Sequence, residues 1–238
     1  MNVYAQALEK HKEWRGKVEI ISKATVKNSA DLSLAYSPGV AAPCREIAEN
    51  PERVWDYTWK GNTIAVVSDG TAVLGLGNIG PAAALPVMEG KAVLFKEFAN
   101  VNAIPLCLNT QDVDEIVQIV KSLEPTIAGV NLEDISAPRC FEIERRLKEE
   151  TNMFVFHDDQ HGTAVVTLAG LINALKVVGK DKDAVIVVNG IGAAGAAIVL
   201  TLLEDGYKNI IPCGRHGRLI PGDPANNPCQ EEIAQATN

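Results

Sequence analysis

Two short acidic segments have the composition and position of a metal site. Asn131-Leu132-Glu133-Asp134 and His157-Asp158-Asp159-Gln160 each follow or end a run of apolar residues that is typical of a buried strand. Ligands of parallel α/β sheets bind beyond the carboxyl ends of the strands, so both segments bring carboxylates to one region. Such carboxylates repel one another, and all-oxygen ligands favour a hard cation such as Mg²⁺ or Mn²⁺ over zinc.

These carboxylates also have a structural interpretation. Acidic residues at strand ends often cap the following helix, and Glu133 and Asp158 fit that role. From spacing alone, the metal site and the helix caps are alternatives of equal weight. His157 and His161 flank the second segment, but lone histidines are more often hydrogen-bonded structural groups, so we leave both out of the metal site.

The pattern GxGxxG occurs twice, and its second copy has the context of a dinucleotide site. A predicted strand, Val185–Asn189, runs directly into Gly190-Ile191-Gly192-Ala193-Ala194-Gly195, and a helix is predicted over Ala193–Glu204. In that geometry Gly190 makes the tight turn, Gly192 lets the backbone approach a pyrophosphate, and Gly195 allows close helix–strand packing. The alternative is a tight turn with small packing residues.

The first copy of the pattern is Gly75-Leu76-Gly77-Asn78-Ile79-Gly80. Pro81 and a run of alanines follow it, which is not the usual fingerprint. We interpret this copy as a turn that lines the substrate cleft.

The end of the next strand bears on the choice of nucleotide. The fingerprint expects an acidic residue there to bind the ribose hydroxyl. Instead, Ile210-Ile211-Pro212-Cys213 is followed by Gly214-Arg215-His216-Gly217, which contains no acid. Arg215, together with His216, is suited to a 2′-phosphate, which favours NADP. The alternative is that Arg215 is a solvated loop residue and that the cofactor is NAD.

Strands and helices alternate along most of the chain. Further strands are predicted at Thr63–Ser68, Ala103–Leu108, Ile127–Asn131, Phe154–His157 and Asn209–Cys213. Further helices are predicted at residues 5–15, Gln111–Leu123, Pro138–Glu150 and Thr163–Val178, with a short helix opening at Asn50-Pro51-Glu52. This alternation is typical of βαβ units, so we expect an α/β protein with a largely parallel sheet.

The domain boundary is predicted near residues 158–163, between the second acidic segment and a long helix. The two parts are a substrate- and metal-binding α/β domain at residues 1–162 and the first part of a Rossmann-like nucleotide-binding domain at 163–238.

The bulk composition excludes several classes of protein. The 238 residues are 47% hydrophobic and 22% charged, a soluble globular composition. A formal net charge of −8 argues against a nucleic-acid partner, which would need Lys and Arg to neutralise phosphates. The sequence opens without a targeting signal, and its apolar stretches look too short and too interrupted to span a bilayer, so no membrane is expected. The five cysteines lack CxxC spacing, which indicates free thiols in a cytoplasmic protein.

Seven segments together resemble the malic enzyme family. They occur in family order over nearly the whole chain, and the likeness is closest to the short prokaryotic type. The segments are Ala35-Tyr36-Ser37-Pro38-Gly39-Val40, Val67-Ser68-Asp69-Gly70, Gly75-Leu76-Gly77-Asn78-Ile79-Gly80, Pro86-Val87-Met88-Glu89-Gly90-Lys91, Asn131-Leu132-Glu133-Asp134-Ile135, His157-Asp158-Asp159-Gln160-His161-Gly162-Thr163 and Val188-Asn189-Gly190-Ile191-Gly192-Ala193-Ala194-Gly195.

The resemblance implies roles that composition does not show. Tyr36 matches the family's catalytic tyrosine, Lys91 matches its catalytic lysine, and Asp158 is an assisting carboxylate. The implied metal ligands are Glu133, Asp134 and Asp159. The implied enzyme is a homodimer that oxidises malate and decarboxylates it to pyruvate and CO₂, with Mg²⁺ or Mn²⁺ and with reduction of NADP or NAD.

The residue types suit that chemistry. Malate loses the proton of its C2 hydroxyl and a hydride from C2. Lys91 can accept the proton if burial or nearby positive charge lowers its pKa. After CO₂ departs, Tyr36 would protonate C3 of the remaining enolate.

Two departures from the family pattern affect these expectations. Larger relatives carry an arginine shortly after the Asp-Gly that matches Asp69-Gly70, where this chain reads Thr71-Ala72-Val73, so another group must bind the substrate carboxylate. The chain also ends at Asn238, where family members continue, so we expect a C-terminally truncated form with half a cofactor site. The alternatives are an oxaloacetate decarboxylase or malolactic-type enzyme with the same site, or an inactive fragment that binds metal or nucleotide.

Overall fold

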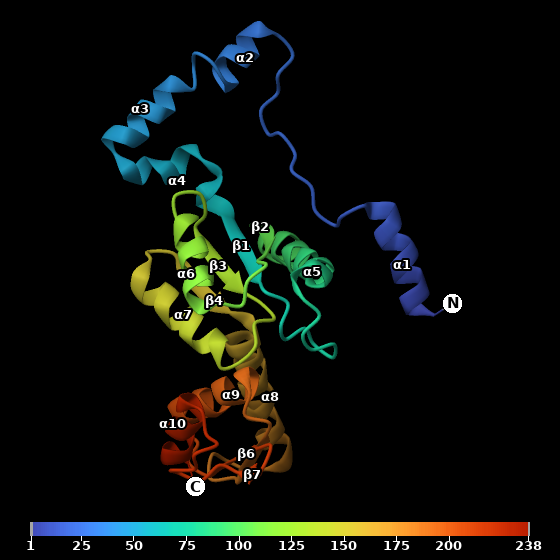
Figure 1. Ribbon diagram of the computed structural model, residues 1–238, viewed down its shortest axis with the longest axis vertical. Coiled ribbons are helices and arrows are strands. Elements are labelled where there is room, and N and C mark those ends of the chain that lie inside the picture. The colour runs from blue at the N-terminus through green and yellow to red at the C-terminus, as the bar shows by residue number, and fades with distance from the viewer. Residues whose placement is uncertain (1, 238) are drawn as a thin grey trace.

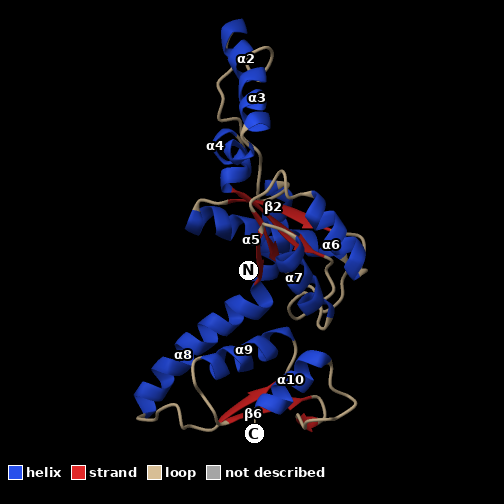
Figure 2. Cartoon of the chain, turned by 90° about the vertical axis from the view of Figure 1, so that its left-hand side faces the viewer, coloured by secondary structure: helices blue, strands red, loops and turns tan. Residues whose placement is uncertain are grey.

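The computed structural model describes residues 2–237, which form an N-terminal arm followed by two α/β units (Figure 1). The arm contains α1 (Val3–Trp14), α2 (Ser29–Ala35) and α3 (Ala41–Glu49), then the short helices η1 (Pro51–Arg53), α4 (Val54–Tyr57) and η2 (Trp59–Asn62). Asn2 and Asn28 cap α1 and α2 through their side chains. In Figures 1 and 2, α2 and α3 project away from the sheets.

The arm exposes much of its apolar surface. From residue 2 to residue 62 no side chain is buried. Ile20 is 86% exposed, Leu34 80% and Tyr4 78%. Lys17 attaches the arm to the first unit, because its backbone N–H donates to Glu89 Oε2 at 3.1 Å. The arm thus leaves large apolar side chains exposed along its whole length.

The first α/β unit is built on a parallel sheet. Its strands β1 (Thr63–Ser68), β2 (Asn102–Cys107), β3 (Gly129–Leu132) and β4 (Phe154–His157) lie in the order β2-β1-β3-β4. They are connected by α5 (Pro81–Ala99), α6 (Val113–Ser122) and α7 (Arg139–Glu150). The α/β fold with a parallel sheet is therefore confirmed.

Helices cover both faces of this sheet (Figure 1). Along β1, Ala65 and Val67 point to the same face, where they join a buried cluster with residues of α6 and α7. Val66 points to the opposite face and is fully buried. Helix α5, which buries Met88, contacts β1 and β2 and carries the chain across the sheet.

The second unit has its own core. A π-helical turn, η3 (Asp158–Gly162), continues into α8 (Thr163–Val178), followed by β5 (Ile186–Asn189), α9 (Ala193–Glu204), β6 (Ile210–Gly214), β7 (Gly217–Arg218) and α10 (Pro228–Ala236). The sheet order is β5-β6-β7, with β5 and β6 parallel and β7 antiparallel. Its buried cluster includes Val199, Leu202 and Ile210. The predicted boundary at residues 162–163 falls where η3 meets α8, and as a domain boundary it stays a prediction.

The expectation that every apolar stretch is too short and too interrupted to span a bilayer is wrong. The continuous helix Asp158–Val178 is long and apolar enough to cross a membrane by length and composition, although only 11% of its most apolar window is buried. The sequence suggested no such stretch, because Asp158 and Asp159 interrupt the apolar pattern that η3 and α8 join into one helix. A single helix of this kind is weak evidence for a membrane span, and here α8 packs against α9 in the second unit.

Candidate active site

The two acidic segments meet beyond the carboxyl ends of β3 and β4. Glu133, Asp134 and Asp159 each offer a carboxylate oxygen that lies within 4.8 Å of the others. The parallel register pairs Leu132 with His157, so the residues that follow these two strands leave the sheet side by side. The structure thus brings the predicted metal ligands together, because they follow adjacent parallel strands that end side by side, as the strand pattern predicted.

Backbone geometry holds the cluster in place. Asp134 adopts a left-handed conformation with φ of 55°, which is rare for a residue with a side chain. Its backbone N–H donates to Asp159 Oδ2 at 2.9 Å, and Asn131 Nδ2 donates to Glu133 Oε2 at 2.7 Å. The helix-cap interpretation of Glu133 and Asp158 is wrong, because α7, η3 and α8 all begin without a side-chain cap hydrogen bond.

The cluster is electrostatically strained without a cation. Burial raises the pKa of Glu133 to about 7, and the nearby Lys91 ammonium offsets only part of this effect. Burial and the adjacent Asp159 carboxylate raise the pKa of Asp134 to about 6. Both carboxyl groups resist ionisation because they lack solvent and share a small volume with like charges.

The donor set fits a hard divalent cation. All three groups are carboxylates, and Asp134 Oδ2 is buried without a hydrogen-bond partner among residues 2–237. An unsatisfied carboxylate oxygen in the interior is costly unless a cation or donor meets it. Mg²⁺ and Mn²⁺ are the ions that such an oxygen cluster would bind.

Lys91 lies beside the cluster. Its Nζ is 2.8 Å from Asp158 Oδ2 and 3.2 Å from Glu133 Oε1. Burial lowers the pKa of Lys91, but the hydrogen bond to Asp158 and the charge of Glu133 outweigh it and hold that pKa above its usual value. The lysine is thus a partly buried cation in contact with two of the named carboxylates. The carboxylates thus give Lys91 a raised pKa, whereas a general base requires a lowered one.

Lys91 lies on α5, and the loop before α5 determines where that helix starts relative to the cluster. Gly70 has φ of 69°, and a Cβ there would lie 2.3 Å from Gly80 O, so the two ends of this loop pack backbone on backbone. Arg139 on α7 fixes the start of the loop, since its Nη1 donates to Asp69 Oδ2 at 2.7 Å and its Nη2 to Thr71 Oγ1 at 2.9 Å. The first GxGxxG copy forms the rest of this loop, and its place beside a substrate stays a prediction.

Tyr36 is not brought to the cluster within this chain. It follows the last residue of α2, on the projecting arm, and is 68% exposed. The ribbon places α2 well away from β3, β4 and α5 in both views (Figures 1 and 2). A site that uses both Tyr36 and Lys91 therefore needs a second copy of the chain or a different position of the arm.

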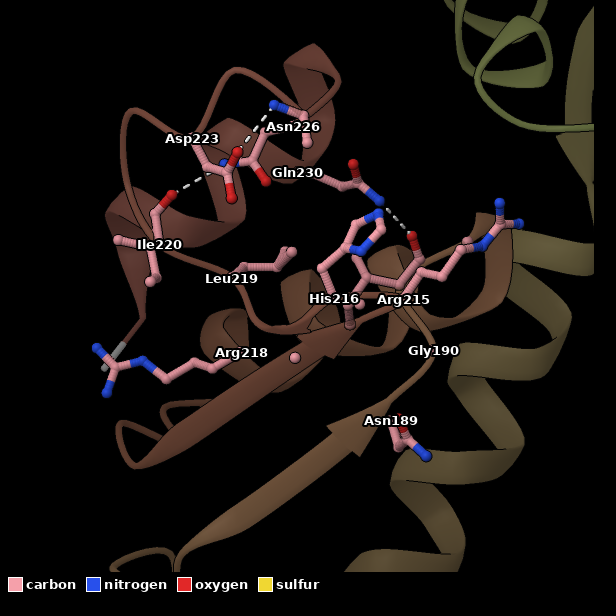
Figure 3. Close-up of a pocket in the computed structure, with 15 residues that line it drawn as sticks. Asn189, Gly190, Arg215, His216, Arg218, Leu219, Ile220, Asp223, Asn226 and Gln230 are labelled. Carbon is pink, nitrogen blue, oxygen red and sulfur yellow. Dashed lines mark hydrogen bonds between the residues drawn. The ribbon is translucent and has the colours of Figure 1, made fainter.

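A cavity of about 600 Å³ lies at the carboxyl ends of β5 and β6 (Figure 3). Gly190, Ile191 and Gly192 line one side, and Arg215 and His216 in the turn after β6 line another. Helix α9 begins at Ala193, and its cap residue Gly192 has no side chain to satisfy the first N–H groups. Free N–H groups at a helix N-terminus are suited to phosphate.

The glycine loop has the shape that its pattern predicts. Gly190 has φ of 106°, and a Cβ at Gly195 would lie 1.9 Å from Gly190 O. Ala194 lies in the first turn of α9 behind this contact, outside the cavity lining. Gln230 of α10 supports the loop from a distant part of the chain, because its Nε2 donates to Ile191 O at 2.9 Å.

Sequence analysis missed several residues of these two sites. The contact of Asn131 with Glu133 could have been predicted, since Asn131 lies two positions before Glu133 and the period of a strand puts both on one face. Gln230 also had a local sequence signal, because Asn227 and Gln230 form a capping box at the start of α10. Arg139 had no such signal, since its partner Asp69 is 70 residues away in the sequence.

Comparisons with known proteins agree over the whole chain. The family model for the malic enzyme N-terminal domain matches residues 15–112 and 109–148. The bifunctional malic/malolactic enzyme of Bacillus subtilis is 60% identical over 100% of this chain and 58% of its own length. The NAD-dependent malic enzyme of Geobacillus stearothermophilus is 61% identical over 94% of this chain and 47% of its own length. The chain thus spans about half the length of these curated relatives.

Solved structures give the same result. The crystal structure of the NAD-dependent malic enzyme from Thermotoga maritima has a TM-score of 0.94 at 54% identity, covering 98% of this chain and 62% of that one. Its likeness extends through the arm and both α/β units, since so little of the chain is left uncovered. The matched family model, the curated relatives and the solved fold converge, and the chain belongs to the malic enzyme family.

Proposed function

We propose that this chain carries the catalytic centre of an enzyme that oxidises malate and decarboxylates it to pyruvate and CO₂. The observation that carries the proposal is the contact of Lys91 with Glu133 and Asp158 at the edge of the three-carboxylate cluster. A lysine beside a divalent-cation site is suited to take up a hydroxyl proton from a substrate once its amine is neutral.

In this proposal Glu133, Asp134 and Asp159 hold Mg²⁺ or Mn²⁺. The ion supplies Lewis acidity, which acidifies a hydroxyl group and stabilises negative charge on an adjacent oxygen. The three carboxylates position it at the sheet edge, where the pKa values of Glu133 and Asp134 fall back once positive charge is present.

Lys91 and Tyr36 handle the protons. Lys91 accepts the proton of the C2 hydroxyl at Nζ, and Asp158, 2.8 Å away, orients that nitrogen and takes part in passing the proton on. The positive charge of a bound cation lowers the pKa of Lys91 from the raised value that the carboxylates give it. Tyr36 donates its hydroxyl proton to C3 after CO₂ leaves.

The second copy of the glycine pattern binds the nicotinamide nucleotide, which accepts the hydride from C2. Curated relatives of both specificities exist, since one from Geobacillus stearothermophilus is named NAD-dependent and one from Rhizobium meliloti NADP-dependent. We favour NADP for this chain, because Arg215 lines the cavity where a 2′-phosphate would lie and no acidic residue follows β6 directly.

The working enzyme is a cytoplasmic homodimer in this proposal. The arm has apolar surface to cover and carries Tyr36 away from its own Lys91, and a second copy answers both requirements. A net charge of −8 supports a small-molecule substrate rather than nucleic acid, and no membrane partner is proposed. The division into a catalytic part at 1–162 and a nucleotide-binding part at 163–238 follows the two separate cores.

A malolactic reaction on the same site is the second candidate. The observation in its favour is the relative from Bacillus subtilis, which is named a bifunctional malic/malolactic enzyme and is 60% identical. That reaction would produce lactate from malate with no net release of reduced nucleotide.

The test uses the purified chain with malate, Mn²⁺ and either NADP or NAD. A rise in absorbance of the reduced nucleotide that a chelator abolishes is the expected result, with NADP the better cofactor. Lactate without reduced nucleotide would favour the malolactic reaction. Metal-dependent decarboxylation of oxaloacetate alone would leave a decarboxylase, and binding without any turnover would overturn the proposed activity for this chain.

A further inference from the structure

A polar network joins α7 to η3, the helical turn that carries Asp159. Its centre is Glu144 on α7, a carboxylate that is only 6% exposed. Its Oε1 is 2.6 Å from His161 Nε2 and 2.8 Å from Lys148 Nζ, and its Oε2 accepts from Gln160 Nε2 at 3.0 Å. Burial raises the pKa of Glu144, but the hydrogen bonds from His161 and Lys148 outweigh it and hold that pKa below its usual value. Glu144 is therefore a charged acceptor.

This charged acceptor fixes the orientation of the Gln160 amide. A carboxylate can only accept, so the amide nitrogen of Gln160, and not its oxygen, must face Glu144. The same nitrogen lies 2.7 Å from His157 Nδ1. Because an amide nitrogen only donates, Nδ1 must be the acceptor, so the N–H of the ring is on Nε2.

The Nε2 atom of His157 faces a predicted metal ligand. His157 is fully buried, and its Nε2 lies 3.3 Å from Asp159 Oδ2. Nε2 has no hydrogen bond that meets full geometric criteria among residues 2–237, so Asp159 is the acceptor that it can reach. The backbone N–H of Asp134 also donates to Asp159 Oδ2, at 2.9 Å. The Asp134 N–H thus already occupies Oδ2, and a proton on His157 Nε2 would be directed at the same oxygen, so that Oδ1 is the oxygen left for a cation.

We propose that Gln160 is a positioning residue for the metal site: it sets the tautomer of His157, whose Nε2–H then holds Asp159 with Oδ1 toward the ion. The inference rests on the proposed function, since it takes Asp159 as a metal ligand. Groups that orient ligands in this way contribute to metal affinity without touching the metal. The sequence analysis assigned no role to His157, Gln160 or His161, whereas the proposed network assigns a role to each of them.

The first measurement reads the tautomer in the metal-free protein. The chain has four histidines, so long-range ¹H–¹⁵N spectra of the imidazoles can be assigned with single substitutions. The expected result is a His157 ring with its N–H on Nε2 and with Nδ1 as acceptor. In a Gln160→Met variant, which keeps the length of the side chain and loses its amide, the Nε2–H form should lose its preference. A wild-type His157 that carries its proton on Nδ1, or that is doubly protonated at pH 7.5, would overturn the proposal.

The second measurement is Mn²⁺ binding, followed by the electron paramagnetic resonance signal of the free ion. Gln160→Met should raise the Kd for Mn²⁺ about tenfold. The matched control is Gln118→Met, the same substitution at an exposed position of α6, and it should change the Kd less than about twofold. Circular dichroism verifies that both variants fold.

An unchanged Kd in folded Gln160→Met would overturn the proposal, as would equal losses in the two variants. A wild-type chain that binds no Mn²⁺ would overturn the proposed function and, with it, the role of Gln160 in metal binding. A failure of the proposed function can be distinguished from a failure of this inference, because the tautomer of His157 is measured without metal and does not depend on Mn²⁺ binding.

Discussion

Glu133 and Asp134 are carboxyl groups whose burial works against their charge. A group with a raised pKa in the folded state contributes stability below its unfolded pKa and loses that contribution as pH rises through the folded value. For these two groups the unfolded values are 4.5 and 3.8 and the folded values are about 7 and about 6. The metal-free protein should therefore lose stability between about pH 4 and about pH 7.

The prediction is tested with Glu133→Gln, which removes one of the two charges. At about pH 8 its Tm should exceed that of the metal-free wild type, by about 2 to 4 °C per kcal/mol of relieved repulsion, and the difference should shrink toward about pH 5. Glu97→Gln, on the exposed side of α5, is the control and should leave the pH profile unchanged. A wild-type Tm that is flat across this window would contradict the raised pKa values.

Arg215 is the residue on which the choice of nucleotide is proposed to depend. Arg215→Ser should raise the Kd for NADP about tenfold, the cost of one lost charge-assisted hydrogen bond, and change the Kd for NAD by less than about twofold. Arg218 lines the same cavity, and Arg218→Ser is the matched control. Fluorescence titration of the reduced nucleotides measures both constants. Equal losses for the two nucleotides would show that Arg215 does not read the 2′-phosphate.

At the scale of elements, the junction of β5 with α9 contains one glycine that is needed for helix packing and another that is proposed to be needed for nucleotide binding. A Cβ at Gly195 would lie 1.9 Å from Gly190 O, whereas a Cβ at Gly192 would have no atom within 4 Å. Gly195→Ala should therefore lower the Tm by several degrees and abolish nucleotide binding, since α9 must move off the strand. Gly192→Ala should leave the Tm unchanged and weaken only nucleotide binding, because its methyl group occupies the approach of the pyrophosphate. Thermal unfolding and titration of each variant decide; a Gly195→Ala chain with wild-type Tm would refute the packing argument.

The strands were more predictable than the helices. All six strands that the sequence predicts are present, with ends shifted by at most two residues, because buried parallel strands read as short apolar runs. The 19-residue α5 was not predicted. It has Pro86 in its interior and exposes Leu85, Val87 and Leu94, so it lacks the single apolar stripe that marks an amphipathic helix. Helices α2 and α3 were missed for a related reason, since they bury nothing within the chain.

Of the candidate site, only the residues that directly follow strands were predictable from the sequence pattern. Glu133 and Asp159 follow adjacent parallel strands, so the geometry of the sheet alone predicts that they meet. Lys91 was found only by resemblance to the family, because it comes from the helix that the pattern did not predict. The contact of Gln160 with Glu144 depends on how η3 lies relative to α7, which no local pattern encodes.

At the scale of the whole molecule, the arm is the feature that a single chain does not explain. In the proposed dimer, each Lys91 works with Tyr36 of the other copy. A mixture of Tyr36→Phe and Lys91→Ala chains tests this, because a mixed dimer then has one intact site and one site with both defects. Random exchange makes half the dimers mixed, so decarboxylation of oxaloacetate should recover to about a quarter of the wild-type rate. No recovery, although mixed dimers have formed, would assign Tyr36 to its own subunit.

In the proposed dimer, an arm without a buried side chain would also tie the rate of the reaction to the abundance of the protein. When a neighbour supplies half of each site, isolated chains are silent, and the rate at low concentration grows with the square of the amount of protein rather than in proportion to it. Dilution then acts as an inhibitor. The cell can thus silence the enzyme by keeping it scarce, with no separate effector and no change in the chemistry of the site.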